Sequence, residues 1–402
     1  MFFNDYIVFI YIAIFVIIYN VINSFVKARG IKNLLIIFAS LLVLLTVVKE
    51  HSLIVLSILS LLVYLVGIVL QRKRSPLILS GILVFILTLF CIRNYPLVQE
   101  IISGSILALI NEPVLSVQKV GISYILFRYV HWLIESYKGS IHRSDFFTFL
   151  NYIFFFPNFL AGPIDSYNNF HYWIGNTRFK YLRHLFFAGI SRIFIGGIKT
   201  LLIVPMVIDY ALDYTVLLPE FSPLMALFLS LLAYSAYIYF DFSGYSDIAI
   251  GTAYLIGIKT PENFNNPYFS LNLSVFWKRW HITFSNFLFA YVFKPLLSLF
   301  NSIFPRFPRI IISILGYLAT FFICGLWHGE TINFVYWGLW HGLGLSIGKL
   351  WVLYVNIPLR IKEGIPYRTA SVVLTFVYVT IGWMFFHYHH HELIEIFNTV
   401  IF

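Results

Sequence analysis

Apolar runs about as long as a membrane-spanning helix recur along almost the whole chain. The first four cover residues 6–26, 33–48, 53–70 and 76–92, and a helix needs about 20 predominantly apolar residues to cross a bilayer. Only 11% of the 402 residues are charged and 60% are hydrophobic, whereas soluble proteins carry about 25% charged residues. This excludes a cytosolic enzyme, a nucleic-acid-binding protein and a disordered chain. It predicts an all-α integral membrane protein.

The loops between these first runs alternate in charge, which predicts their sides of the membrane. Basic residues gather at 27–32 and 72–74, while residues 49–51 carry little net charge. Lysine and arginine collect in cytoplasmic loops, so we expect the N-terminus outside the cytoplasm. No basic residue precedes the first run, so we expect a retained helix rather than a cleaved signal. The net charge of +10 then reflects orientation, with no nucleic-acid partner.

Beyond residue 93 the apolar pattern becomes less regular. We expect roughly a dozen membrane-embedded helices, some not fully spanning, in a single multi-span domain over residues 1–402 with N-terminal helices at 1–95. The expected later segments are residues 97–110 (interfacial or re-entrant), 121–135, 146–160, 182–210, 225–239, 248–258, 282–300, 310–327, 332–355 and 370–386.

Polar residues within apolar surroundings are costly in a membrane and commonly line a site. His328 lies in the run Gly-Leu-Trp-His-Gly-Glu (325–330) at the end of a long apolar stretch. A buried imidazole stays neutral because desolvation disfavours the cation, so it can accept a proton from a hydroxyl. A Trp-His pair that anchors a helix end at the interface fits these local features equally well.

A second polar cluster, residues 276–283, places Lys278 and Arg279 between two tryptophans, with His281 beside Trp280. One interpretation is an aromatic and basic belt at the cytoplasmic face, which is common. The other is a surface formed by Lys278, Arg279 and Trp280 that binds an anionic donor, with His281 pointing inward. The polar stretch at residues 259–268 is then a loop or interfacial segment joined to this surface.

Other polar groups carry weaker signals. Residues 239–247 hold two acids that could pair with Lys278 or Arg279, and His131 and Glu135 share a helical face. His341 is either packed or pore-lining, and the histidines at 387–391 are expected to be exposed at the interface rather than to bind metal. The two cysteines support neither a disulfide framework nor a metal site. We therefore expect no bound metal.

Four motifs, in this order, closely resemble those of the membrane-bound O-acyltransferases. They are Gly-Tyr-Ser-Asp (244–247), Pro-Glu-Asn-Phe-Asn (261–265), Trp-Lys-Arg-Trp-His (277–281) and Gly-Leu-Trp-His-Gly (325–329). Within that family the chain is similar to the bacterial branch that holds the alginate O-acetylation protein and the teichoic-acid D-alanyl transferase. The resemblance runs from about Gly121 to Gly344. It departs from the family at residues 289–295, where the usual Arg-Asp pair is missing.

The resemblance implies a ring of helices around a thin central region, with a funnel from each face. It implies a catalytic core at residues 121–344, followed by C-terminal helices at 345–402. The family's catalytic histidine falls on His328, and its second histidine falls on His281. Lys278, Arg279 and Trp280 then become the expected donor-binding residues.

The function that we expect is transfer of a small acyl group, acetyl or D-alanyl, to a hydroxyl of an extracytoplasmic cell-envelope polysaccharide or teichoic acid. The donor would be a cytoplasmic thioester, either acyl-CoA or an acyl carrier protein with a phosphopantetheine arm, and no cofactor would be tightly bound. An extracytoplasmic partner protein would assist. The alternatives are a transporter or flippase with broken helices, and a scaffold for a separate acylating enzyme.

Overall fold

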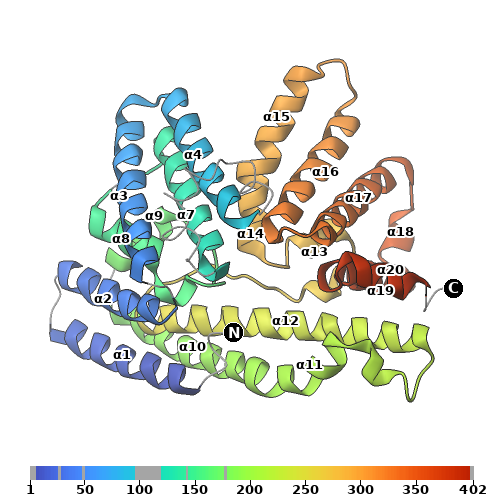
Figure 1. Cartoon of the computed structure of the whole chain (residues 1–402), viewed down its shortest axis with the longest axis horizontal. Coiled ribbons are helices and arrows are strands. Elements are labelled where there is room, and N and C mark those ends of the chain that lie inside the picture. Colours follow the sequence, from blue (N-terminus) through green and yellow to red (C-terminus); the bar gives the residue numbers. More distant parts are fainter. Residues whose placement is uncertain are drawn as a thin grey trace. The chain divides into compact units, whose positions relative to one another are not determined.

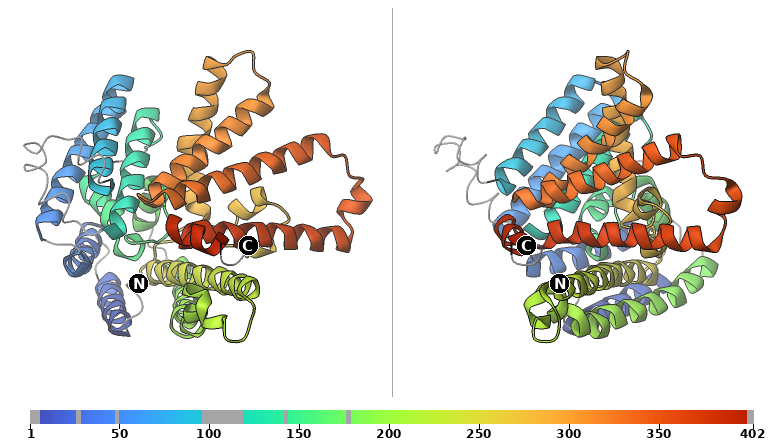
Figure 2. Two further views of the ribbon diagram at one scale, coloured as in Figure 1. Left: turned by 45° about the vertical axis from the view of Figure 1, so that its right-hand side comes forward. Right: turned by 90° about the vertical axis from the view of Figure 1, so that its right-hand side faces the viewer.

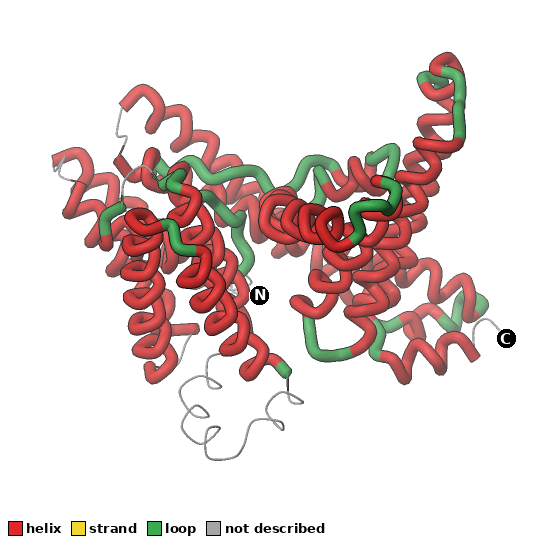
Figure 3. Tube along the Cα trace, turned by 90° about the horizontal axis from the view of Figure 1, so that it is seen from above, coloured by secondary structure: helices red, strands yellow, loops and turns green. Residues whose placement is uncertain are grey.

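The computed structural model describes residues 6–25, 29–47, 50–95, 119–141, 144–175 and 179–398, and these residues form helices and no strand (Figure 3). Within them, six helices are long and apolar enough to cross a membrane, and three shorter helices are apolar. The prediction of an all-α, multi-pass membrane protein is therefore confirmed. The expected segment at residues 97–110 lies outside the described residues. The helix ring, its funnels and the division at residues 95, 121 and 344 stay predictions.

The chain forms two compact units, the first comprising residues 1–197 and 245–261. Within this unit α3, α4 and α7 pack against one another, and α2 packs against α8 (Figure 1). Lys32, expected in a loop, lies buried in the first turn of α2. The helices of unit 1 are α1 (Tyr6–Phe25), α2 (Arg29–Val47), α3 (Glu50–Lys73), α4 (Pro76–Asn94), α7 (Lys119–Lys138), α8 (Phe146–Phe154), η2 (Phe156–Asn158), α9 (Tyr167–Gly175), α10 (Phe179–Gly197) and the end of α12 (Pro223–Leu255).

The second unit comprises residues 198–244 and 262–402. Its α16 packs along α17, and α17 packs on α19 (Figure 2). Its helices are η3 (Ile198–Ile203), α11 (Val204–Leu212), η4 (Tyr214–Leu217), the start of α12, η5 (Pro267–Phe269), α13 (Leu273–Trp277), α14 (Ile282–Leu288), η6 (Phe289–Phe293), α15 (Lys294–Ile303), α16 (Arg309–His328), α17 (Ile332–Tyr354), α18 (Leu359–Lys362), α19 (Ile365–His387) and α20 (His390–Ile396).

Helix α12 differs from the sequence prediction, which placed two apolar segments at 225–239 and 248–258. The structure has one helix of 33 residues that continues through the polar stretch between them. The stretch stays helical because its polar side chains are buried within the protein: Asp241, Ser243, Ser246 and Asp247 are each at most 5% exposed. Asp247 also pairs with Arg192 of α10. A hydropathy profile scores the polarity of each residue and does not show that these polar side chains are buried within the protein.

Helix α8 also differs from the prediction, because it ends at Phe154 rather than continuing to residue 160. A residue that precedes proline disfavours the helical conformation, and Pro157 follows closely. The guanidinium of Arg128 in α7 satisfies carbonyls that the helix end leaves open. Its Nη1 donates to the carbonyls of Tyr152 and Ile153 at 2.9 and 2.6 Å, and its Nη2 donates to that of Asn158 at 2.7 Å. The buried side chain of Arg128 thus holds in place the buried segment that follows the end of α8.

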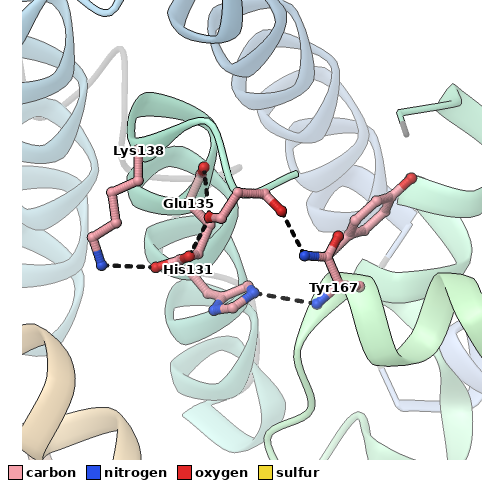
Figure 4. Close-up of polar contacts among 6 residues, drawn as sticks. His131, Glu135, Lys138 and Tyr167 are labelled. Carbon is pink, nitrogen blue, oxygen red and sulfur yellow. Dashed lines mark hydrogen bonds and ion pairs between the residues drawn. The ribbon is translucent and has the colours of Figure 1, made fainter. Parts of the chain in front are cut away.

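Side chains of the C-terminal half of α7 also join this helix to α9 (Figure 4). His131 accepts a hydrogen bond at Nε2 from the Tyr167 backbone N–H at 3.2 Å, at the first residue of α9. Glu135 accepts from the Lys138 ammonium at 2.8 Å and from the Ser140 hydroxyl. His131 therefore joins α7 to the start of α9, and Glu135 holds the C-terminal end of α7.

In unit 2, glycines allow α16 and α17 to pack with their backbones almost in contact. A Cβ on Gly325 would lie 2.4 Å from the Phe334 carbonyl oxygen, and one on Gly338 would lie 2.2 Å from that of Phe321. Small residues commonly permit such close approach between membrane helices. This close packing holds the C-terminal end of α16, and with it His328, against α17.

Candidate active site

The segment before α14 is pinned by backbone hydrogen bonds to the polar stretch that precedes α13. The Asn265 N–H donates to the Arg279 carbonyl, and the Ile282 N–H donates to the Asn263 carbonyl, both at 2.9 Å. Between these two bonds His281 adopts a left-handed conformation with φ of 42°. Such a conformation is uncommon for a residue other than glycine and persists where the surrounding structure enforces it. The side chain of His281 is thereby aimed by the backbone.

His281 is 4% exposed and Asn263 is fully buried. The His281 Nδ1 lies 3.0 Å from the Asn263 Oδ1, and the same oxygen accepts a hydrogen bond from the Thr283 hydroxyl at 2.9 Å. Burial lowers the pKa of His281 well below its ordinary value, and the neighbouring His328 lowers it further. The imidazole is therefore neutral at neutral pH and can accept a proton.

His328 is the last residue of α16, where the chain turns towards α17. Its ring lies edge-on to those of Trp337 and Phe386, with centroids 4.8 and 5.1 Å apart, and it stacks on Phe334. Neither ring nitrogen makes a hydrogen bond with any other described residue. The site therefore positions His328 by packing and leaves its nitrogens available to a ligand.

A single aromatic ring contacts both histidines. Phe284, in the first turn of α14, stacks on His281 with centroids 4.9 Å apart and lies edge-on to His328 at 6.3 Å. The two histidines predicted from separate motifs thus share a contact with Phe284 within unit 2. Two neutral imidazoles in one apolar environment can receive and return a proton.

The predicted donor-binding residues lie in different environments. Lys278 is exposed at the end of α13. The Arg279 guanidinium donates to the Phe269 carbonyl at 3.2 Å. Trp280 is buried and stacks among Phe264, Phe276 and other rings. Lys278 is accordingly the one of the three whose charge projects from the surface, whereas Trp280 packs the interior of the segment.

The acidic residues of α12 do not pair as the sequence suggested. Asp247 forms an ion pair with Arg192 within unit 1, not with Lys278 or Arg279. Asp241 is buried and makes no ion pair with any residue in the described part of the chain. The described ranges contain no group of three or more His, Cys, Asp or Glu side chains placed to hold a metal ion.

The other histidines of unit 2 make different contacts. His341 is fully buried against the rings of Trp277 and Trp337, each 5.1 Å away, so it is packed. His387 donates from Nε2 to the Leu212 carbonyl oxygen at 3.0 Å. His389, His390 and His391 are exposed, as the sequence predicted.

Asn263 is the site residue that sequence reasoning missed. The motif around it was noted, but the residue had no assigned role. Its partner His281 lies 18 positions further along the chain, beyond the reach of helical spacing. The one available signal was an uncharged amide inside a polar stretch directly before an aromatic and basic motif.

Comparison with known proteins shows the family of the chain. The family model of the membrane-bound O-acyltransferases, MBOAT, matches residues 50–391. The chain is 28% identical to a teichoic acid D-alanyltransferase of Bacillus subtilis over 336 residues, covering 80% of this chain and 81% of that protein.

Two further relatives have O-acetylating names. A probable alginate O-acetylase AlgI of Pseudomonas aeruginosa is 31% identical over 66% of this chain and 48% of that protein. A peptidoglycan O-acetyltransferase of Helicobacter pylori is 31% identical over 60% of this chain and 44% of that protein. The matches thus span about half the length of these relatives. The extent of the family match and the common chemistry of these names lead to one conclusion: the chain belongs to the membrane-bound O-acyltransferase family and is an acyltransferase.

Proposed function

We propose that the chain moves a small acyl group, acetyl or D-alanyl, from a cytoplasmic thioester to a hydroxyl of an extracytoplasmic cell-envelope polymer. The observation that carries the proposal is the contact of both His281 and His328 with the ring of Phe284. The names of the relatives support the polymer class, since they act on teichoic acid, alginate or peptidoglycan.

In the proposed reaction His328 is the general base. The hydroxyl oxygen attacks the thioester carbonyl while His328 accepts the hydroxyl proton. The new C–O bond forms, the C–S bond breaks, and the thiolate leaves and takes up the proton. A base placed in this way contributes about 10²–10⁴-fold to the rate. Its aromatic surroundings keep water away from the reacting groups.

The donor approaches from the cytoplasm in this proposal, as acyl-CoA or as the phosphopantetheine thioester of an acyl carrier protein. The exposed ammonium of Lys278 suits an anionic donor, because a cation on a surface attracts phosphates and acidic proteins. Lys278→Ala should therefore raise the donor concentration at half-maximal rate and leave the maximal rate unchanged; an unchanged concentration would refute this role.

The same proposal places the chain in a bacterial cell membrane with its N-terminus outside the cytoplasm. Arg72 and Lys73 end α3 and are exposed, which suits a cytoplasmic loop under the positive-inside rule. A partner protein on the outer side would assist the transfer to the polymer. Accessibility labelling of a cysteine placed next to Arg74 from either side of the membrane tests this orientation.

The test uses purified protein in liposomes with acetyl-CoA or a D-alanyl carrier thioester, and it measures release of the free thiol in the presence of an acceptor polymer. We expect the wild-type protein to release thiol and His328→Ala to be at least about 100-fold slower. His391→Ala, a change at an exposed histidine, is the matched control and should retain the wild-type rate.

Two results would contradict the proposal. One is a His328→Ala variant with the wild-type rate. The other is a wild-type protein that moves a glycan across the liposome membrane without releasing thiol, which would favour the transporter or flippase alternative.

A further inference from the structure

A backbone group fixes the orientation of the Asn263 amide. The Thr283 N–H lies 3.4 Å from the Asn263 Oδ1 and can only donate. The atom that faces it must therefore be the amide oxygen rather than the amide nitrogen. The Thr283 hydroxyl donates to the same oxygen at 2.9 Å. Two donors from one residue thus hold the amide with Oδ1 towards α14.

This orientation determines which nitrogen of His281 carries the proton. The His281 Nδ1 lies 3.0 Å from Oδ1, and a carbonyl oxygen can only accept, so Nδ1 must donate. A neutral imidazole carries one proton, and the other nitrogen is then an acceptor. The lone pair of neutral His281 therefore resides on Nε2.

We propose that Asn263 is a positioning residue that holds His281 in the tautomer whose Nε2 accepts a hydrogen bond or a proton from the substrate. The assignment of a substrate to this nitrogen rests on the proposed function, whereas the tautomer itself does not. In the proposed reaction the groups that can donate to Nε2 are the acceptor hydroxyl and the amides of a pantetheine arm. Neutral His281 cannot then stabilise an oxyanion through Nε2, which leaves positioning of a substrate as its role.

A purely structural role for Asn263 makes different predictions. Its backbone carbonyl accepts from the Ile282 N–H, and this bond survives any change of the side chain. A side chain that only packed would affect the amount of folded protein, without changing the proton affinity of His281. The proton affinity therefore separates the two roles.

The described surroundings of His281 include apolar rings. Phe242 of α12 and Phe284 of α14 pack against the imidazole and carry no charge. His328 of α16 is a titratable group that acts on His281 electrostatically. A carboxylate at position 263 would place a negative charge in direct contact with Nδ1 of His281.

Asn263→Asp should shift the acid limb of the activity–pH profile to higher pH. A carboxylate in place of the amide keeps the acceptor for Nδ1–H and stabilises the imidazolium, which raises the pKa by about one unit or more. Activity that needs neutral His281 is then lost at a higher pH than in the wild type. Asn286→Asp, which adds the same charge at an exposed position of α14, is the matched control and should leave the acid limb in place.

Asn263→Ala should lower the maximal rate about 10- to 100-fold, as loss of a group that orients a reactive side chain commonly does. An acid limb that does not move in Asn263→Asp, in protein that accumulates normally, would overturn the proposal.

The closing experiment needs no acyl transfer, so its result is independent of the proposed function. It records nitrogen NMR spectra of the full-length protein labelled with ¹⁵N-histidine, and the His281→Gln spectrum identifies the His281 signals. We expect a protonated Nδ1 and an unprotonated Nε2 in the wild type, and a loss of this preference in Asn263→Ala. A protonated Nε2 in the wild type, or the same tautomer preference in both proteins, would overturn the role of Asn263.

Discussion

Buried arginine and buried histidine are used differently in the two units. In unit 1 the guanidinium of Arg128 donates three hydrogen bonds to backbone carbonyls at the end of α8. In unit 2 aromatic rings surround His328, and its nitrogens make no hydrogen bond within the described residues. His281 uses one nitrogen, Nδ1, to bind Asn263. Both kinds of group are costly to bury, yet Arg128 commits its donors to the fold, whereas His328 commits neither ring nitrogen to another described residue.

This difference separates a structural from a functional use of polar residues in a membrane protein. A buried polar group is tolerated where hydrogen bonds offset its desolvation. Arg128 meets that condition within unit 1, so its removal should affect folding. His328 meets it only when a ligand or water is present, so its removal should affect chemistry.

The largest expected effect is that of Arg128→Ala on folding. Three carbonyls lose their donor, at about 1–3 kcal/mol for each buried group left unsatisfied. We expect little folded protein in the membrane and a melting temperature in detergent at least about 10 °C lower. Arg183→Ala, a change at an exposed arginine of α10, is the control. Normal accumulation of Arg128→Ala would contradict the structural role of Arg128, and with it the difference between the two units.

A smaller effect is expected for Phe284→Leu, which removes the ring that contacts both histidines and keeps an apolar side chain. The imidazoles lose a contact that sets their relative position, and small misplacements of reacting groups are costly. We expect thiol release to slow about tenfold with the melting temperature within a few degrees of wild type. Phe289→Leu, at a half-exposed ring of η6, should keep the wild-type rate. Equal rates for both variants would show that Phe284 does not couple the histidines.

The smallest effect is a pH dependence of stability in unit 1. Burial raises the pKa of the Asp165 carboxyl to about 7, although hydrogen bonds from Asn169 and Ser166 and the charge of Arg128 oppose the shift. Because the folded pKa lies above the ordinary value, the stabilising contribution is complete below about pH 4 and is lost as pH rises to about 7.

The melting temperature of the wild type should therefore fall by a few degrees more between pH 5 and pH 8 than that of Asp165→Asn, in which this position no longer titrates. Asp209→Asn, a change at an exposed aspartate of α11, should leave the pH dependence as in the wild type. Parallel curves for wild type and Asp165→Asn would contradict the assignment.

Hydropathy predicted the helices well where one face meets lipid and the run is uninterrupted, as in α3, α16 and α19. It failed where burial within the protein replaced exposure to lipid. The polar middle of α12 was taken as an interruption because the pairing of Asp247 with Arg192, 55 positions away, is invisible in the local sequence. The early end of α8 depends in the same way on Arg128, a residue of another helix.

The candidate site, like the helices, could be predicted only in part from the sequence. His281 and His328 were found because motifs mark them, and their common contact with Phe284 is a consequence of folding. Asn263 was missed because its role depends on the direction of one amide, which Thr283 sets in three dimensions. A linear sequence shows which polar groups are present and cannot show which of them has its hydrogen bonds satisfied.

The central claim is that His281 and His328 act as one site, and a double-mutant comparison tests it most directly. Thiol release is measured for the wild type, His281→Ala, His328→Ala and the variant with both changes. Residues that act as a unit are strongly non-additive. We predict that the double variant is no more than about threefold slower than the slower single variant. Independent effects, in which the rate losses of the two single variants multiply, would contradict the account.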